Sequence, residues 1–444
     1  MLKILLNVIK SDGPEKSGLI SMAVKPFAVI LSLLYVPLLL NYLGDEKYGV
    51  WATILSIISW INYFDVGIGN GLRNGLTKDL TNKDYVHAKQ IVSTSYIILT
   101  FISSGIFLLS LLSVYSLNWK KIFSTEIAVE PTLIITFAFI CTNFILSLVN
   151  TILYALQMAE KVAIRNCFVQ VINIISLIAL SKISEGSLVL VAIIFGASTL
   201  FVNVLSTFHI IKGRDYLRPS LRSYNKGTIP DICKTGLQFF IIQIMCLLMF
   251  TMDNLIISHY FGPNAVTSFS IANKIYNTGY SFIAAFLVPY WSGTTSAIER
   301  GDTEWIRRSI KKTTKILFAF IVGSVIVTVL FRQITFMWLH KELEYGTGIP
   351  ALMCVFYVLY SILAIECQFI NGTGMLKIQL IMYLILGIGN VPLSILMGVN
   401  MGMQAFGVRL ATTILVFIAV IVLGINLKMI LEKIEKRKMN HLRT

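Results

Sequence analysis

Six charged residues interrupt long apolar runs of this sequence: Lys25, Asp65, Asp253, Lys274, Glu366 and Arg409. A charge inside an apolar run that spans a membrane costs a few kcal/mol or more, so such a charge is a functional candidate by default. A cation that faces a cavity can hold a phosphate or another anion. A buried carboxylate can take up and release a proton when its surroundings change.

The three cations differ in depth within their runs. Lys25 precedes Pro26 and lies a turn or two inside its run, where its amine could face a cavity or snorkel to the interface. Arg409 is shallow enough to leave the same two alternatives open. Lys274 lies near the middle of its run and cannot easily reach water, which favours a functional role for it.

The carboxylates Asp253 and Glu366 each have two alternative roles. Asp253 could carry a coupling ion or pair with Lys274 across neighbouring helices, and the cost of an unpaired charge favours the pair. Glu366 has no evident partner in the sequence, which favours it as a proton switch, although it is also close enough to the membrane interface to reach it.

Asp65 belongs to the stretch INYFDVGIGNGLRNGLTK, which closes the second apolar run. Its carboxylate could pair with Lys25 at similar depth, or it could belong to a helix-terminal turn with no moving part. Three alternating glycines after it allow the helix to unwind or to pack closely, and two cations then anchor the interface: Gly67, Gly69 and Gly71, then Arg73 and Lys78. The glycine pattern is not a nucleotide fingerprint, because no strand precedes it and no acidic ribose ligand follows.

The elements that position these residues are transmembrane helices. Of the 444 residues, 56% are hydrophobic and only 13% are charged, against about 25% charged in a soluble domain. Twelve runs reach the roughly 20 residues that a spanning helix needs: 19–43, 48–70, 90–117, 131–157, 163–181, 188–211, 235–260, 265–291, 316–338, 350–371, 378–399 and 404–429.

Lys and Arg residues alternate between the connecting segments in a way that fixes the orientation. With both termini in the cytoplasm, and with cations near the ends of a run counted in the adjoining segment, 28 of the 37 cations fall in cytoplasmic segments and 6 in outer segments, and the remaining 3 lie within spans. This asymmetry follows the positive-inside rule and supports an even number of spans. It also accounts for the net charge of +15 without a nucleic-acid partner.

Several classes of activity are disfavoured. The six cysteines lack CxxC spacing and the five histidines are scattered, so no metal site is expected. The sequence has no P-loop, and the segments between the runs are too short for a catalytic domain. We therefore expect a protein that is not an enzyme and that carries no cofactor.

Two short similarities indicate an internal repeat. NYLGDEKYGVWA (41–52) resembles HYFGPNAVTSFS (259–270), and NKDYVHAK (82–89) resembles GDTEWIRR (301–308), at nearly the same offset of about half the chain. Parallel repeats of this kind build two lobes that rock in alternating access. The predicted organisation is a six-helix lobe, a basic cytoplasmic linker, a second six-helix lobe and a basic cytoplasmic tail: 1–211, 212–234, 235–429 and 430–444.

The YLGDEKYGVW turn, the FDVGIGNGLRN segment and the six-plus-six repeat resemble the polysaccharide transport family, the Wzx-type flippases with the MATE-like fold of the MOP superfamily. This resemblance implies a multi-pass protein of the bacterial inner membrane. It would flip undecaprenyl-diphosphate-linked oligosaccharide, the repeat unit of O-antigen, capsule or exopolysaccharide, with H⁺ or Na⁺ as a possible coupling ion.

By the same resemblance, the cations Lys25, Lys274 and Arg409 would line a cavity for the diphosphate and acidic sugars. A polysaccharide polymerase and a chain-length regulator are the partners that the family implies. The alternative is a cation-coupled multidrug exporter of the same fold, whose cavity would be more apolar and acidic. A membrane glycosyl-polymer enzyme is disfavoured by the short outer loops, and a scaffold would not need buried charges.

Overall fold

The computed structural model describes residues 14–44, 67–119, 127–339 and 348–441, together with 47–48, 50–51 and 54–55. Throughout these residues the chain forms helices and short connections, and no strand occurs among them. The longer helices of the first half are α2 (Pro14–Leu43), α4 (Ile68–Thr81), α5 (Tyr85–Ser116), α7 (Glu130–Leu146), α8 (Leu148–Ala155), α9 (Ala159–Leu180) and α10 (Leu188–Ile211).

Three short 3₁₀ turns then lead into the second half: η1 (Asp215–Leu217), η2 (Leu221–Ser223) and η3 (Lys226–Thr228). The remaining elements are α11 (Ile229–Glu299), α12 (Thr303–Val329), α13 (Phe331–Leu339), α14 (Ile349–Thr373), α15 (Lys377–Ile395), the π-helical turn η4 (Leu396–Asn400) and α16 (Gln404–His441).

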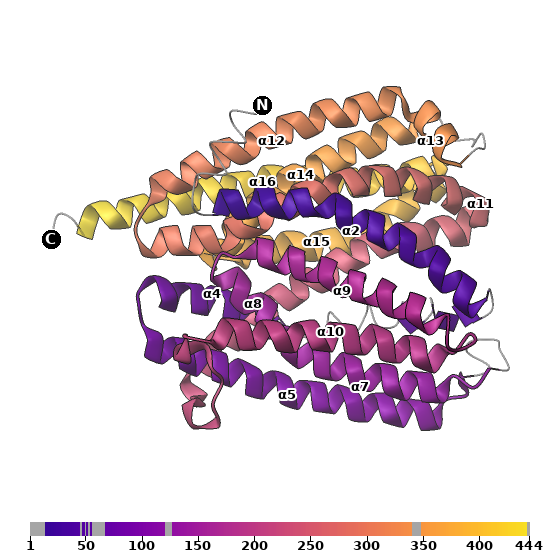
Figure 1. The fold of residues 1–444 in the computed structure, drawn as a ribbon. Helices are drawn as coiled ribbons and strands as arrows, with labels where there is room; N and C mark the ends of the chain where they lie inside the picture. Colours follow the sequence, from indigo (N-terminus) through magenta and orange to yellow (C-terminus); the bar gives the residue numbers. More distant parts are fainter. Residues whose placement is uncertain are drawn as a thin grey trace. The chain divides into compact units, whose positions relative to one another are not determined.

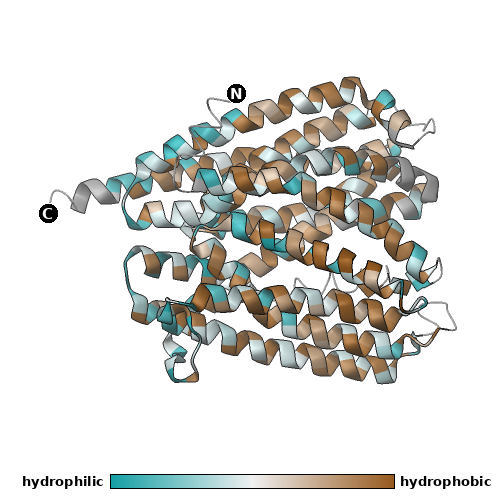
Figure 2. Ribbon diagram, viewed as in Figure 1, coloured by the Kyte–Doolittle hydropathy of each residue, from teal (hydrophilic) through white to brown (hydrophobic). Residues whose placement is uncertain are grey.

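The helices group into two compact units, Leu19–Phe240 and Ile241–Thr444, the second together with Met1–Gly18. In the first unit α7 lies between α5 and α10 (Figure 1). In the second unit α16 packs against both α14 and α15. Hydrophobic residues spread along the length of α7 and α10, whereas the C-terminal part of α16 is hydrophilic (Figure 2).

Ten helical stretches among the described residues are long and apolar enough to cross a membrane. They correspond to all the predicted spans except the second and the eighth. Most of the second, 48–70, falls outside the described residues. The eighth, 265–291, is helical, but its Lys, Asn, Ser, Thr and Tyr residues make it less apolar than the others. The chain is thus a multi-pass membrane protein, and the number twelve stays a prediction.

Helix α11 contains the predicted seventh and eighth spans in one helical segment of 71 residues. Asp253 and Asn273 both belong to it, and both contact the guanidinium of Arg409, at 3.3 Å and 3.0 Å. In a straight helix these two positions would lie about 30 Å apart. The helix therefore bends back between them, which is how one helical segment supplies two spans.

The predicted repeat has a structural counterpart in two matching turns. Lys83 has a φ of 60° and Gly301 a φ of 68°, and each is followed by an aspartate. The side chain of Asp84 accepts a hydrogen bond from the backbone N–H of His87, and that of Asp302 accepts one from Trp305, both at 2.9 Å. Each aspartate thus caps the helix that follows it.

These turns correct the register of the second sequence similarity by one position. The sequence comparison aligns residue 82 with residue 301, whereas in the structure Lys83 corresponds to Gly301 and Asp84 to Asp302. The corrected register is the one that the first similarity, of 41–52 with 259–270, already has. One offset therefore relates both parts of the repeat.

A second pair of contacts repeats in this register. The Thr77 hydroxyl donates to the carbonyl of Arg73 at 2.7 Å and lies 3.4 Å from the carbonyl oxygen of Ala155, and the Thr295 hydroxyl donates to the carbonyl of Gly372 at 2.9 Å. The two threonines correspond, and the two carbonyls correspond to within one position. In each half, this contact joins the helix before the capped turn to the end of another helix, so the repeat includes a tertiary contact as well as short sequence similarities.

The glycines of the 61–78 stretch serve close packing. Gly67 has a left-handed backbone with a φ of 71°, and a Cβ placed on it would lie 1.9 Å from the carbonyl oxygen of Gly236. A Cβ on Gly71 would lie 2.5 Å from the carbonyl oxygen of Ile232. Of the two alternatives, close packing therefore holds for α4, which lies against the first turns of α11. Asp65 itself lies outside the described residues.

Arg73, which the sequence predicts as an anchor at the membrane interface, is buried against another helix. Its side chain is buried at 5% exposure, and its guanidinium lies over the ring of Tyr154, 4.9 Å from the ring centroid. The apolar side chains of α4 and α8 meet in one hydrophobic cluster around this contact. Arginine suits such a position because its flat, weakly hydrated head stacks on aromatic faces.

Burial raises the pKa of Asp79, which is only 6% exposed, although its hydrogen bond with His87 at 2.8 Å acts in the opposite direction. A raised pKa in the folded state means that this carboxyl group contributes stability at low pH, and that the contribution is lost as the pH rises through the raised value. We therefore expect Asp79→Asn to flatten the decrease in the apparent melting temperature between pH 4 and pH 8.

The measurement is thermal unfolding of the detergent-solubilised protein at a series of pH values, with exposed Asp215→Asn as the control. The Asp79→Asn variant should be more stable than the wild type at pH 8 and should lose that advantage at pH 4. Equal slopes for the two proteins would contradict the prediction.

Candidate functional site

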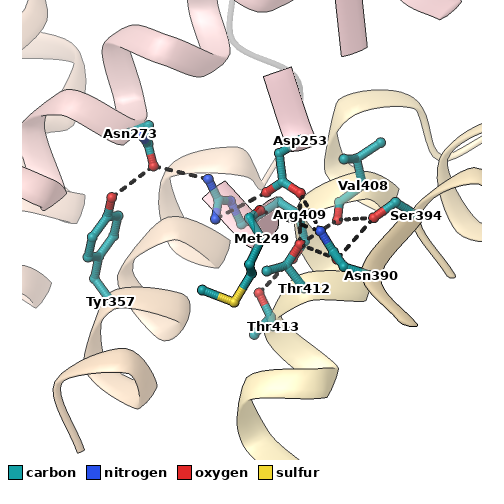
Figure 3. Close-up of polar contacts among 10 residues, drawn as sticks. All are labelled: Met249, Asp253, Asn273, Tyr357, Asn390, Ser394, Val408, Arg409, Thr412 and Thr413. Carbon is teal, nitrogen blue, oxygen red and sulfur yellow. Dashed lines mark hydrogen bonds and ion pairs between the residues drawn. The ribbon is translucent and has the colours of Figure 1, made fainter. Parts of the chain in front are cut away.

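Two of the predicted site residues meet in a buried ion pair in the second unit. Nη1 of Arg409 lies 3.3 Å from Oδ2 of Asp253, and both side chains are almost fully buried, at 2% and 1% exposure (Figure 3). Neither atom makes a well-aligned hydrogen bond within the described part of the chain. The contact is therefore mainly electrostatic, and the two charges compensate each other.

Other side chains hold both partners in place. Nη2 of Arg409 donates to Oδ1 of Asn273 at 3.0 Å, and the hydroxyl of Tyr357 donates to the same oxygen at 2.9 Å. Phe269 and Phe356 cover the guanidinium, with ring centroids 4.8 Å and 4.3 Å from its carbon. The arginine is thus fixed by an amide, two rings and a carboxylate.

The carboxylate has its own support. Its Oδ1 accepts hydrogen bonds from the Thr412 hydroxyl at 2.9 Å and from the Asn390 amide at 3.1 Å. Oδ1 of Asn390 accepts from the Ser394 hydroxyl at 3.2 Å and lies 2.8 Å from the Thr412 hydroxyl oxygen, whose single proton is within reach of both Asp253 and Asn390 (Figure 3). Helices α11, α14, α15 and α16 all contribute to this network. A buried pair is costly to desolvate, and such hydrogen bonds offset part of that cost.

The partner of Asp253 differs from the one expected. The sequence interpretation pairs Asp253 with Lys274, but the structure pairs it with Arg409. Asn273, one residue before Lys274, contacts Arg409, whereas the Lys274 side chain is exposed on the surface of its unit. Neighbouring positions on a helix point about 100° apart, which is why these two cannot share one partner.

Glu366 on α14 lies against the backbone of α16. A Cβ placed on Gly424 would come within 2.9 Å of Oε1 of Glu366, so a side chain there would require this carboxylate to shift. Oε2 is buried and has no hydrogen-bond partner among the described residues. Such an oxygen is costly to leave unsatisfied, which keeps Glu366 a candidate for binding a proton or a cation.

Lys25 on α2 is half-buried in the first unit. The adjacent Val24 carbonyl lies 3.9 Å from Sγ of Cys167 on α9, so α2 contacts α9 at this level. The described structure gives no carboxylate partner for Lys25, and Asp65, the partner expected from the sequence, lies outside the described residues. Lys25 therefore keeps the two alternatives given by the sequence: its amine faces a cavity, or it extends to the membrane interface.

A cavity of about 210 Å³ lies within the first unit, between α7, α8, α9 and α10. Its polar lining consists mainly of amide and hydroxyl groups around one arginine: Asn143, Ser147, Asn150, Arg165, Asn166, Thr199 and Asn203. Phe139, Phe144 and Phe195 add aromatic surface. The described lining residues include no Asp or Glu, so the cavity carries net positive charge.

Arg165 is held in the cavity by two asparagines. Its terminal nitrogens donate to the side-chain oxygens of Asn150 and Asn203, and the Asn203 amide donates to Asn143 at 3.1 Å. Its Nε is buried without a hydrogen-bond partner among the described residues. In contrast to Arg409, Arg165 forms no ion pair with a described carboxylate. An uncompensated guanidinium beside amides is suited to bind an anion.

A break between two helices shapes this cavity. α7 ends at Leu146 and α8 begins at Leu148, and Ser147 between them lines the cavity. The N–H of Asn150 bonds to the carbonyl of Ser147 at 2.8 Å, a tight turn inside one spanning segment. Interrupted spanning helices are typical of substrate sites in transporters.

The sequence interpretation missed this cavity because it considered only charges inside the predicted spans. Arg165 lies at the very start of the predicted fifth span, 163–181, and is therefore grouped with the cytoplasmic cations, whereas α9 begins at Ala159 and carries Arg165 about two turns further on. The available signal was the set of asparagines in apolar runs, because polar residues within spans commonly bond across helices.

Comparison with known proteins identifies the fold and the family of this chain. The structure superposes on "Crystal structure of MATE P26A mutant" with a TM-score of 0.80, covering 97% of this chain and 98% of that one at 17% identity. The chain is thus a multi-pass membrane protein with the MATE transporter fold.

A family described as "Polysaccharide biosynthesis protein" matches residues 16–294, and a family described as "MatE" matches 239–396. The chain belongs to the polysaccharide biosynthesis protein family, which confirms the resemblance drawn from the sequence motifs.

Two curated relatives have similar length. A Salmonella typhimurium protein named "Putative O-antigen transporter" is 22% identical over 360 residues, which is 80% of each chain. A Yersinia pseudotuberculosis protein named "Putative O-antigen export protein" is 21% identical over 364 residues, covering 79% of this chain and 81% of that one. Both relatives are thus named for transport or export.

Proposed function

We propose that this protein flips undecaprenyl-diphosphate-linked oligosaccharide units across the bacterial inner membrane by alternating access of two six-helix lobes. The units would be those of O-antigen, capsule or exopolysaccharide. The proposal includes twelve spans with both termini in the cytoplasm and the lobe boundaries at 211 and 235. A polysaccharide polymerase and a chain-length regulator would use the exported units.

The observation that carries the proposal is the cavity around Arg165. A diphosphate or an acidic sugar presents oxygens that pair with a guanidinium, and neutral sugar hydroxyls pair with amides and hydroxyls. The cavity offers all of these groups and has no described acidic residue in its lining. It is too small for a whole oligosaccharide, so it would hold one charged group or sugar at a time.

The other predicted site residues take subsidiary roles in the proposal. Lys25 and Lys274 would add positive charge along the path of the anionic head. Glu366 and Asp65 would be the candidates for a coupling H⁺ or Na⁺. The pair of Asp253 and Arg409 would act as a gate or as a fixed support, because within the described residues its two charges already compensate each other.

The test is made in the source organism with the gene deleted and replaced by variants. We expect Arg165→Ala to reduce surface polysaccharide roughly 10- to 100-fold, since a hydrogen bond to a charged group is worth about 1.5–3 kcal/mol. Lipid-linked units should accumulate facing the cytoplasm, which a membrane-impermeant sugar-labelling reagent can detect. Arg165→Lys, which keeps the charge, should retain part of the activity.

Lys161→Ala is the matched control, because Lys161 is an exposed cation one turn earlier on the same helix α9. Membrane levels of every variant are measured by a fluorescent fusion to separate folding from transport. Normal export by a well-expressed Arg165→Ala protein would show that the cavity does not bind substrate. Normal export by the deletion strain would remove the flippase function altogether.

The second candidate function is export of cationic drugs, which the match of the MatE family to residues 239–396 favours. It predicts that deletion increases sensitivity to cationic dyes while the lipid-linked units still reach the outer leaflet. The cavity around Arg165 disfavours it, because a guanidinium repels cationic drugs.

A further inference from the structure

The segment 212–228 between the two halves is an ordered strap, a name we use for these residues. The strap is fastened to the first turns of α5 by side chains of that helix. The N–H of Ser220 donates to Ser93 at 3.0 Å, and that of Asn225 donates to Thr94 at 3.2 Å. The Asn225 side chain also bonds to Gln90 at 2.9 Å. The strap therefore has a defined position on α5 instead of being a free linker.

The strap presents a strongly positive surface. It contains five cations and a single acidic residue, Asp215. Four of these cations are exposed: Lys212, Arg218, Arg222 and Lys226. The guanidinium groups of Arg218 and Arg222 form no ion pair or hydrogen bond with other described residues. A positive surface at the end of a spanning helix is complementary to anionic lipid headgroups.

An apolar groove of about 360 Å³ opens between the strap and α5. Ile97 and Phe101 form its wall on α5, and Pro219 and Leu221 form its wall on the strap. Leu221 lies between Arg218 and Arg222 in the sequence, and its side chain is 83% exposed. A leucine side chain in this position gains free energy if it enters the headgroup and acyl boundary of a bilayer.

The groove continues into an exposed apolar surface of α5. Phe101 is 76% exposed, and Leu108, Leu109 and Leu112 further along α5 are also exposed. These positions recur at helical spacing on one side of a membrane-spanning helix, the arrangement expected for acyl-chain contact. An acyl chain on this side of α5 could thus extend into the groove without leaving an apolar environment.

We propose that the strap and the first turns of α5 form a binding site for one anionic phospholipid. Its acyl chain lies along Phe101 in the groove, its phosphate is held by Arg218 and Arg222, and Leu221 covers the glycerol region. This site is separate from the substrate cavity, and its existence does not depend on which molecule the protein transports.

The test measures binding of fluorescent phosphatidylglycerol to the purified full-length protein in neutral detergent micelles, with unlabelled phosphatidylglycerol or phosphatidylcholine as competitor. We expect phosphatidylglycerol to compete and phosphatidylcholine to compete weakly. The double variant Arg218→Gln/Arg222→Gln should bind roughly 20- to 30-fold more weakly, since each basic residue near an anionic surface contributes about a five-fold effect. Leu221→Ser should weaken binding without changing the preference for phosphatidylglycerol.

Lys433→Gln/Lys436→Gln provides the charge-matched control, because both lysines are exposed on the tail of α16. An equal loss of binding in this control would show that net charge alone attracts the lipid, and would overturn the site. Unchanged binding in the strap variant would overturn it as well. A dimer that Leu221→Ser dissociates in mass photometry would assign the groove to a second copy of the chain instead. Each readout is independent of polysaccharide export.

Discussion

Arg409→Met is expected to reduce the yield of folded protein severely, because it leaves the carboxylate of Asp253 buried without its cation. Breaking a buried ion pair from one side costs about 3–5 kcal/mol, a large part of the stability of a typical domain. The measurement is the monodisperse fraction after detergent extraction, together with the apparent melting temperature. Asp253→Asn should be similarly harmful, since it leaves the guanidinium of Arg409 unpaired among aromatic rings.

The double variant Asp253→Asn/Arg409→Met separates a structural pair from a gate. Replacing both partners removes both buried charges, and such replacements are often neutral or stabilising. We expect the double variant to recover most of the folded yield. If it also exports polysaccharide normally, the pair is a fixed support; if it folds but fails to export, the charges act in the transport cycle. A double variant no more stable than either single variant would contradict the energetic coupling of the two residues.

Gly67→Ala is expected to destabilise the first unit strongly for two separate reasons. The left-handed φ of 71° alone costs an alanine about 1–2 kcal/mol. The added Cβ would also lie 1.9 Å from the carbonyl oxygen of Gly236, so the backbones of α4 and α11 would have to separate. Thermal unfolding in detergent and the expressed membrane level measure the effect, and both should decrease.

Gly44→Ala is the matched control for this prediction. Gly44 has nearly the same φ, 74°, but a Cβ placed there has nothing within 4 Å. It should therefore lose only the backbone contribution, and the difference between the two variants isolates the cost of crowding. Equal effects of the two substitutions would show that α4 and α11 can move apart at little cost.

The membrane class, ten of the spans and the family could be predicted from the sequence because they depend on local features. An apolar run long enough to cross a bilayer must be helical, since backbone groups in hydrocarbon have to bond internally. The repeat was visible because the same capped turn occurs around Asp84 and Asp302. Its exact register followed only from the structure, where the left-handed residue and the capping aspartate align the two turns.

The partners of the buried charges could not be predicted in the same way. Two of the candidate cations follow Asp253, Lys274 nearby and Arg409 much further along the chain. Only the bend in α11 and the packing of α16 bring the distant one, Arg409, into contact. Sequence separation carries little information about such contacts, because a helix side chain can face any neighbour. The cavity around Arg165 was missed for the same reason, since its polar groups come from four helices.

The general architecture is therefore readable from the sequence: a multi-pass helical membrane protein with a repeated half, basic connecting segments and a few charges within its apolar runs. Those properties follow from amino-acid composition and from the spacing of apolar and charged residues, which are local features of the chain. The partner of each buried charge, in contrast, depends on how the helices pack. Arg409 meets a carboxylate and Arg165 meets asparagines, because the packing of whole helices places each guanidinium among its neighbours.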